Sequence, residues 1–159
     1  MFTQAPSSAP AAAASATPAE PIPLVMQIIV DGSSSDLQSW PKGPWMAQAA
    51  HAAIAAIQIS SSSPASQEYV SESNLASMHK VVLQTPKEGK AKMSLQDLSE
   101  KLSEARKVYE EGGEQGEEFP KHHLWVEQPE GLATCLALAP NRKPAALKKI
   151  LRPCTLLKD

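Results

Sequence analysis

Four polar residues are the strongest candidates for chemistry in this chain. Gln48 and His51 stand three residues apart in a segment made largely of alanine. On a helix, this spacing places both side chains on one face, about one turn apart. Glu127 ends one apolar run, and Thr134 lies just inside the next. An amide, an imidazole, a carboxylate and a hydroxyl are groups that bind substrates and transfer protons.

Each of these residues also has an ordinary structural explanation. A single histidine on a helix is more often structural than functional, and a glutamate at a strand end is usually only solvated. Residue pattern alone therefore leaves both interpretations open. In a sheet covered by helices, however, strand ends and helix starts meet at one edge, and ligands tend to bind there.

Other kinds of site have no support in the sequence. The chain contains no glycine-rich phosphate loop, no G-x-S-x-G nucleophile elbow and no Cys/His spacing typical of zinc. His122 and His123 are neighbours on a predicted strand, so they point to opposite faces and would not bind one metal ion. We expect neither a metal nor a nucleotide cofactor.

The elements that must position these residues alternate between strand and helix. The run at residues 24–30 is apolar throughout, which is typical of a central strand covered on both faces. A tight "PEG" turn makes the last two strands antiparallel neighbours. The order predicts an α/β fold, a three-layer sandwich with a mixed four-stranded sheet flanked by helices. Strands are expected at residues 24–30, 79–85, 122–128 and 132–140, and helices at residues 44–59, 66–78, 94–111 and 143–151.

Two of the predicted helices have apolar stripes that indicate their buried faces. The stripe of the first helix, which we expect to begin at Pro44, consists of Met46, Ala50, Ala53, Ile54 and Ile57. The stripe of the third consists of Leu95, Leu98, Leu102, Ala105 and Val108. Ser94 and Asp97 precede and open that third helix with a spacing close to a capping box.

Composition sets limits on domain organisation and location. Residues 1–23 are mostly Ala, Ser and Pro and predict a disordered tail, and residues 24–159 predict one folded domain. Residues 112–118 read as a flexible insertion. The net charge of −2 does not single out a nucleic-acid partner. The chain has no apolar run of about 18 residues and no arginine-rich targeting segment, so we expect a cytoplasmic protein.

Several segments resemble the type II peptidyl-tRNA hydrolase family. They are "LVMQIIV" before a Gly/Lys loop, "AQAAHAA" on the first helix, "KVVLQTP" and "LWVEQPEGLATCLALAP". The sequences of the first-helix segment and of the last segment resemble most closely the subgroup called peptidyl-tRNA hydrolase domain-containing protein 1. The resemblance covers nearly the whole chain after residue 23. It implies a mixed four-stranded sheet flanked by helices, in agreement with the predicted order of elements.

The resemblance also implies a reaction and a set of site residues. The family cleaves the ester that joins a peptide to the 3′ end of tRNA, and it needs no metal. Gln48 and His51 match the Gln and His of its helix motif, Glu127 falls where it has an active-site Asp, and Thr134 falls on a Thr that helps to position the attacking water. The partner is then peptidyl-tRNA. The residues expected to meet its phosphates are Lys42, Lys80, Arg142 and Lys143.

This chain departs from the family pattern at the active-site lysine. The family reads K-G-K, whereas here Lys42 and Gly43 are followed by Pro44. Glu127 is longer than the family's Asp, and the loop before Thr134 is shorter. Loss of a positioned cation costs on the order of a few kcal/mol of transition-state stabilisation, or hundreds-fold in rate. A catalytically impaired binder of tRNA or of a protein therefore stays open, as do an unrelated function and the choice between monomer and homodimer.

Overall fold

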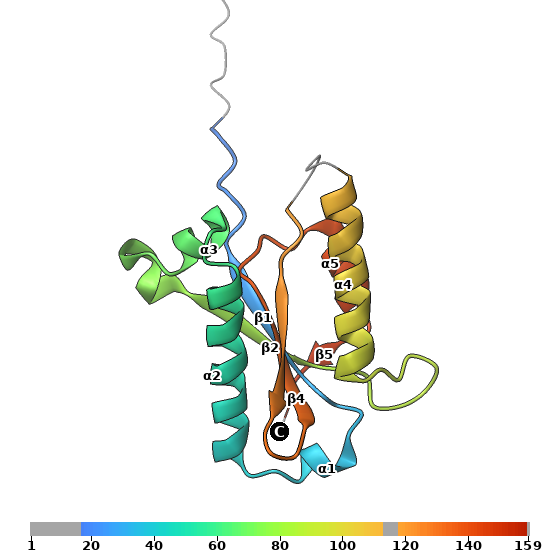
Figure 1. The fold of residues 1–159 in the computed structure, drawn as a ribbon. Helices are drawn as coiled ribbons and strands as arrows, with labels where there is room; N and C mark the ends of the chain where they lie inside the picture. Colours follow the sequence, from blue (N-terminus) through green and yellow to red (C-terminus); the bar gives the residue numbers. More distant parts are fainter. Residues whose placement is uncertain (1–16, 113–117, 159) are drawn as a thin grey trace, which may run out of the picture.

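A single mixed β-sheet forms the centre of the molecule (Figure 1). The computed structural model describes residues 17–112 and 118–158. The strand order is β3-β4-β1-β2-β5. The strands are β1 (Val25–Val30), β2 (His79–Gln84), β3 (His122–Glu127), β4 (Leu132–Leu138) and β5 (Thr155–Leu156). The helices are α1 (Ser35–Gln38), α2 (Lys42–Ile59), α3 (Pro64–Tyr69), the 3₁₀ helix η1 (Glu72–Ser77), α4 (Leu95–Glu111) and α5 (Ala145–Leu151).

The predicted α/β sandwich is confirmed, with five strands in place of the expected four. β1 pairs in parallel with β2 and antiparallel with β4, and β3 and β4 form the predicted antiparallel pair. The additional strand, β5, pairs antiparallel with β2 through Leu83 and Leu156. It is only two residues long, which is too short for an alternating pattern to indicate it in the sequence.

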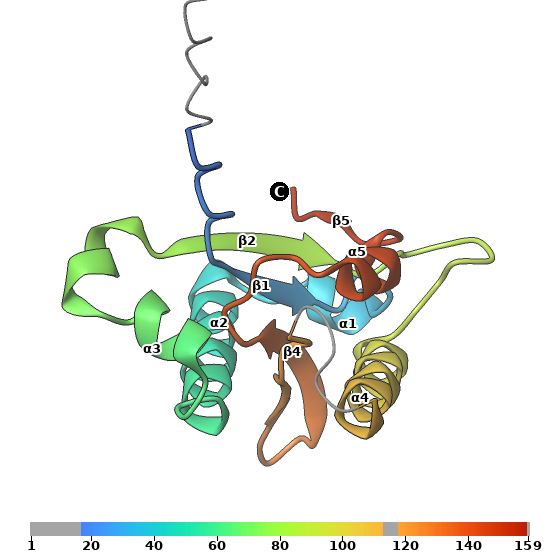
Figure 2. The ribbon, with the colours of Figure 1, turned by 90° about the horizontal axis from the view of Figure 1, so that it is seen from above.

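Helices cover both faces of the sheet, and β1 is buried on both. Figure 2 shows α2 on one side of β4 and α4 on the other. Met26 and Ile28 pack toward Ala52 and Ala56 of α2, whereas Ile29 packs in a second cluster with Leu98 and Leu102 of α4. Alternate residues of β1 thus pack into two separate cores, one on each face of the sheet, which explains the unbroken apolar run.

The predicted apolar stripe of α2 is correct at Ala53 and Ile57, which pack against the core, and wrong at Met46, Ala50 and Ile54, which are exposed. Met46 is 74% exposed and Ile54 is 71% exposed. The stripe that faces the sheet consists of Gln48, Ala52 and Ala56. An alanine-rich helix has small apolar residues on every side, so the larger ones do not mark its buried face. Here the helix packs through its alanines, whose short side chains let it lie close to the strands.

The predicted stripe of α4 is correct except at its end. Leu95, Leu98 and Leu102 are fully buried, and Ser94 forms the expected capping box with Asp97. Val108 is 65% exposed, whereas Ala105 and Tyr109 pack against the core, so the buried face of the last turn passes through Tyr109 instead.

Some helix boundaries also differ from the prediction. α2 begins at Lys42 rather than at Pro44, which costs no hydrogen bond because the first N–H groups of a helix have no partner within it. The second predicted helix is divided into α3 and η1. The short helix α1 was not predicted; Ser34 caps it by accepting from the backbone N–H of Leu37.

Two of the predicted segments fall mainly outside the described residues. Of the predicted disordered tail, residues 1–16 are not described, and the same holds for residues 113–117 of the predicted insertion. Within the described ranges, no helix is both long enough and apolar enough to cross a membrane.

Candidate active site

The four candidate residues come from α2, β3 and β4. Gln48 and His51 lie on α2, Glu127 is the last residue of β3, and Thr134 is the third residue of β4. Figure 1 shows the turn between β3 and β4 at the same end of the molecule as the start of α2. The predicted meeting of strand ends and helix start at one edge is therefore present, on the face of the sheet that α2 covers.

A β-bulge turns Thr134 toward α2. The register of β3 and β4 shifts between Trp125, which pairs with Cys135, and Val126, which pairs with Ala133. Thr134 is thus the extra residue on β4, with no partner on β3. Without the bulge, strict alternation would place Thr134 on the α4 face, because Cys135 belongs to the α2-side core. Bulges commonly redirect a side chain in this way next to active sites.

Thr134 and Gln48 form a buried hydrogen bond. The Thr134 hydroxyl donates to Gln48 Oε1 at 2.8 Å. Thr134 is 0% exposed and Gln48 is 5% exposed, so water does not compete for this bond. Since the Gln48 oxygen accepts from Thr134, its amide N–H₂ group is the end that acts on Glu127 and favours the ionised carboxylate.

Trp125 holds the other side of the Glu127 carboxylate. The indole Nε1–H of Trp125 donates to Glu127 Oε2 at 2.9 Å. The two residues are two apart on β3 and therefore share a face. Thr134 thus orients the Gln48 amide, and Gln48 and Trp125 both act on the Glu127 carboxylate.

His51 lies against the same tryptophan. Its ring stacks on that of Trp125, with centroids 4.5 Å apart and planes at 16°. Trp125 therefore contacts two of the predicted site residues, although sequence reasoning missed it. The available signal was the spacing Trp-x-Glu at a strand end, which puts an indole N–H beside a carboxylate.

Hydrogen bonding lowers the pKa of Glu127. The largest cause is the bond from Trp125, followed by the bond from Gln48, and the charge of His51 acts in the same direction. These groups favour the ionised carboxylate, while its partial burial opposes them. Glu127 is thus charged at neutral pH.

The loop that departs from the family pattern forms the first turn of α2. Lys42 and Pro44 are both exposed there. Trp40 and Trp45 flank them, with ring centroids 5.9 Å apart. Trp45 also packs against the α2-side core, so the start of α2 is anchored beside the exposed lysine.

The predicted phosphate-contacting residues do not form one group. Lys42 lies at the site end, whereas Lys80, Arg142 and Lys143 lie near the start of β1, where Val25 bridges to Asn141. The Lys80 ammonium lies 5.3 Å from the centroid of the Tyr69 ring. Arg142 forms an ion pair with Glu68 at 2.9 Å. Their role as RNA contacts stays a prediction.

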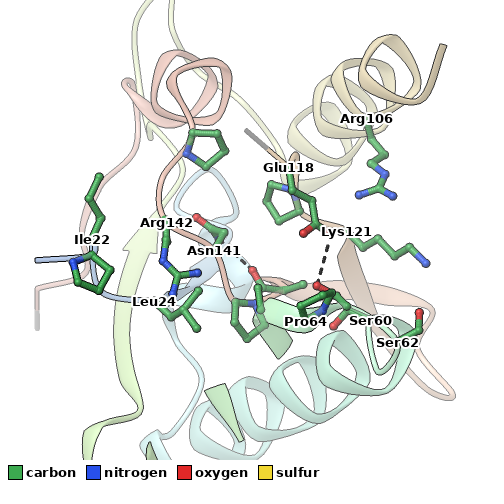
Figure 3. Close-up of a pocket in the computed structure, with 17 residues that line it drawn as sticks. Ile22, Leu24, Ser60, Ser62, Pro64, Arg106, Glu118, Lys121, Asn141 and Arg142 are labelled. Atoms are coloured by element: carbon green, nitrogen blue, oxygen red, sulfur yellow. Dashed lines mark hydrogen bonds between the residues drawn. The ribbon is translucent and has the colours of Figure 1, made fainter. Parts of the chain in front are cut away.

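Arg142 lines a cavity at this opposite end of the molecule. Figure 3 shows it between the N-terminal segment at Ile22, the end of α2 at Ser60 and the segment at Asn141. Its volume is about 520 Å³. Gln48, His51, Glu127 and Thr134 are not among its lining residues, so the candidate active site is a separate surface.

His122 and His123 point to opposite faces of β3, as predicted. His122 Nε2 lies 2.8 Å from the Ser99 hydroxyl of α4, and the His123 ring lies 6.2 Å from that of Trp125 on the α2 side. Within the described part of the chain, no group of three or more His, Cys, Asp or Glu residues is placed to hold a metal ion.

Comparison with known protein families assigns the chain to a class. A sequence profile described as "Peptidyl-tRNA hydrolase PTH2" matches residues 24–157. The chain therefore belongs to the PTH2 family of peptidyl-tRNA hydrolases, as its resemblance predicted.

Two mammalian relatives are more specific. The chain is 37% identical over 129 residues to the human protein named "Putative peptidyl-tRNA hydrolase PTRHD1", covering 80% of this chain and 79% of that protein. It is 36% identical over 125 residues to the mouse protein of the same name, covering 78% and 76%. The predicted likeness to this subgroup is thus confirmed.

Proposed function

We propose that this chain hydrolyses the ester between a peptide and the 3′ end of tRNA. Membership of the PTH2 family supports this reaction. The observation that carries the proposal is an arrangement of two hydrogen bonds, from Thr134 to Gln48 and from Trp125 to Glu127, in which Gln48 and Trp125 both favour the ionised carboxylate. It presents an ionised carboxylate with a fixed orientation at an open edge of the sheet.

In this proposal Glu127 is the general base. An ionised carboxylate has about four lone-pair sites, and the donors from Trp125 and Gln48 leave room for a water molecule. Glu127 takes a proton from that water while the water oxygen attacks the ester carbonyl carbon. The bond from the carbonyl carbon to the ribose oxygen then breaks, and Glu127 returns the proton to that oxygen. The products are the free peptide acid and the tRNA 3′ hydroxyl.

The other polar residues of the site fix the base and the negative charge that develops. Thr134 orients the Gln48 amide, which keeps its N–H₂ group directed at Glu127. The developing oxyanion needs a cation or an N–H donor. With Pro44 at the family's lysine position, Lys42 is the exposed cation in the first turn of α2, and we assign it this role.

A turnover assay with a matched pair of variants tests the proposal. Purified protein is incubated with N-acetyl-aminoacyl-tRNA, and release of free tRNA is measured. Glu127→Gln keeps the shape of the side chain and removes the base, so the rate falls about 10²–10⁴-fold. Glu130→Ala removes an exposed carboxylate from the adjacent turn and keeps the rate. Absence of turnover by the unaltered protein at high concentration, or full activity of Glu127→Gln, contradicts the proposal.

A non-catalytic binder is the second candidate function. It is favoured by Pro44, which places a neutral ring where the family has its active-site lysine. This candidate predicts tRNA binding that weakens steeply with salt and no release of peptide. Loss of a measurable hydrolysis in Glu127→Gln, with tRNA affinity unchanged, excludes it.

A further inference from the structure

Trp125 covers one face of the His51 ring, and the residue as a whole is exposed. The nearly parallel stack with Trp125, at 4.5 Å and 16°, occupies one face. His51 is nevertheless an exposed residue. Its imidazole makes no hydrogen bond to any of the described residues, so this contact with Trp125 is what fixes the plane of the ring. An exposed aromatic ring of fixed orientation is a platform on which another flat ring can stack.

We propose that the face of His51 opposite Trp125 binds the base of the 3′-terminal nucleotide of the substrate. The inference rests on the proposed function and adds to it the means by which the RNA end is held. The bound base continues the stack of Trp125 and His51 by one ring. His51 is then a substrate-binding residue rather than a proton donor.

The position of His51 relative to Glu127 favours the terminal base over other flat groups. His51 is close enough to Glu127 for its charge to affect the carboxylate, and it lies one helical turn from Gln48. The ester to be cleaved is on the ribose that carries the terminal base, so a single sugar separates the base from the reacting carbonyl. That base is adenine in every tRNA, whereas the side chains of the peptide vary.

Stacking suits this task because it does not depend on a particular hydrogen-bonding pattern. Every base has a π-face, and stacking on an aromatic side chain contributes about five-fold to a hundred-fold in affinity per base. A ring held in place by Trp125 loses little further freedom on binding. The same tryptophan orients Glu127 through its N–H group, so one side chain aligns the platform with the base that activates water.

The tryptophans provide a direct readout. The chain has three of them, so an ¹⁵N-correlated NMR spectrum contains three indole N–H signals, and Trp125→Phe identifies that of Trp125. The unaltered protein is titrated with the trinucleotide C-C-A and with the same molecule lacking its terminal base. We expect the Trp125 signal to shift on addition of C-C-A, and the abasic molecule to bind about tenfold or more weakly.

Two substitutions separate stacking from proton transfer. His51→Ala removes the platform and weakens C-C-A binding about tenfold or more. His51→Phe keeps a flat ring and binds within about threefold of the unaltered protein, with KM for N-acetyl-aminoacyl-tRNA preserved in the same way. His79→Ala, an exposed histidine at the far end of β2, is the matched control and keeps the affinity. Circular dichroism establishes that each variant is folded.

The outcomes distinguish this inference from the proposed function. If His51→Ala binds C-C-A as well as the unaltered protein, or if His51→Phe loses as much affinity as His51→Ala, the stacking inference is refuted even when hydrolysis is observed. If the protein binds C-C-A in a His51-dependent way and hydrolyses nothing, the stacking inference stands and the proposed function fails.

Discussion

Replacing Thr134 with valine removes one hydroxyl group and keeps the shape of the side chain. In the unaltered protein this hydroxyl donates to Gln48 Oε1 at 2.8 Å. Thr134 is 0% exposed and Gln48 is 5% exposed, so water cannot replace the lost donor. A buried acceptor left without a partner costs about 1–3 kcal/mol. For a chain of 159 residues, each kcal/mol lowers Tm by roughly 2–4 °C, which predicts a decrease of about 2–12 °C.

Gln48→Met completes a double-mutant cycle. Methionine has nearly the length of glutamine and no hydrogen-bonding amide, so this variant leaves the Thr134 hydroxyl unpaired. The bond from Gln48 to Glu127 is lost in the single and in the double variant alike, and its contribution therefore cancels. In the double variant neither partner is left unpaired. We expect it to be more stable than the sum of the single effects predicts, by about 1–2 kcal/mol.

The free energy of unfolding of the four proteins is measured by urea titration, followed by circular dichroism. Ser66→Ala serves as the additivity control, because Ser66 is equally buried but hydrogen-bonds Ser60 at the other end of α2. Its effect should add to that of Thr134→Val within about 0.5 kcal/mol. A coupling of less than about 0.5 kcal/mol between Thr134 and Gln48 would refute the claim that this bond stabilises the site.

Three further predictions concern the base, the lysine position and the packing of α2. The pKa of Glu127 is lowered from 4.5, and its ionised form is the active one in the proposed reaction, so kcat/KM should not depend on this group from pH 7 to pH 5 and should fall only below about pH 4.5. Trp125→Phe removes a hydrogen bond that favours the ionised form, so it should move that fall to higher pH. A fall centred above pH 5 in the unaltered protein contradicts the assignment. Pro44→Lys should raise the turnover rate by about tenfold or more if the position faces the substrate, and an unchanged rate in a folded variant shows that it does not. Ala52→Leu should push α2 away from the sheet and lower the unfolding free energy by about 1–3 kcal/mol, whereas Ala50→Leu on the exposed side should change it by less than about 0.5 kcal/mol; equal losses would mean that the buried side of α2 is misassigned.

The four longer strands and the order of the longer helices could be predicted because their signals are local. The apolar run at β1 indicates a strand buried on both faces, and the spacing of Ser94 and Asp97 indicates the start of α4. The buried face of α2 could not be predicted in this way, since an alanine is apolar on whichever side it lies. Gln48 is the clearest example: a polar residue lies on the buried stripe because Thr134, 86 positions away, supplies its hydrogen bond.

The sequence indicated four residues of the candidate site, missed Trp125, and only partly predicted the geometry. Helical spacing places Gln48 with His51, and strand alternation places Trp125 with Glu127. The position of Thr134 depends on a register shift between two strands, and nothing within either strand alone specifies it. The same holds for the stack of His51 on Trp125, because it depends on how closely α2 approaches β3.

Thr134 occupies a place that the hydrogen-bonded ladder between β3 and β4 does not use. Ala133 and Cys135 already oppose the consecutive residues Val126 and Trp125, so deletion of Thr134 would leave two regularly paired strands and an intact pair of cores. The Thr134 hydroxyl and the pairing of β3 with β4 therefore depend on different residues, so one can change in evolution without the other. Under the proposed function, a relative that lacks this one residue would keep the strand pairing and lose the hydroxyl that orients Gln48, so the register of this single hairpin is a more direct guide to the site than overall similarity.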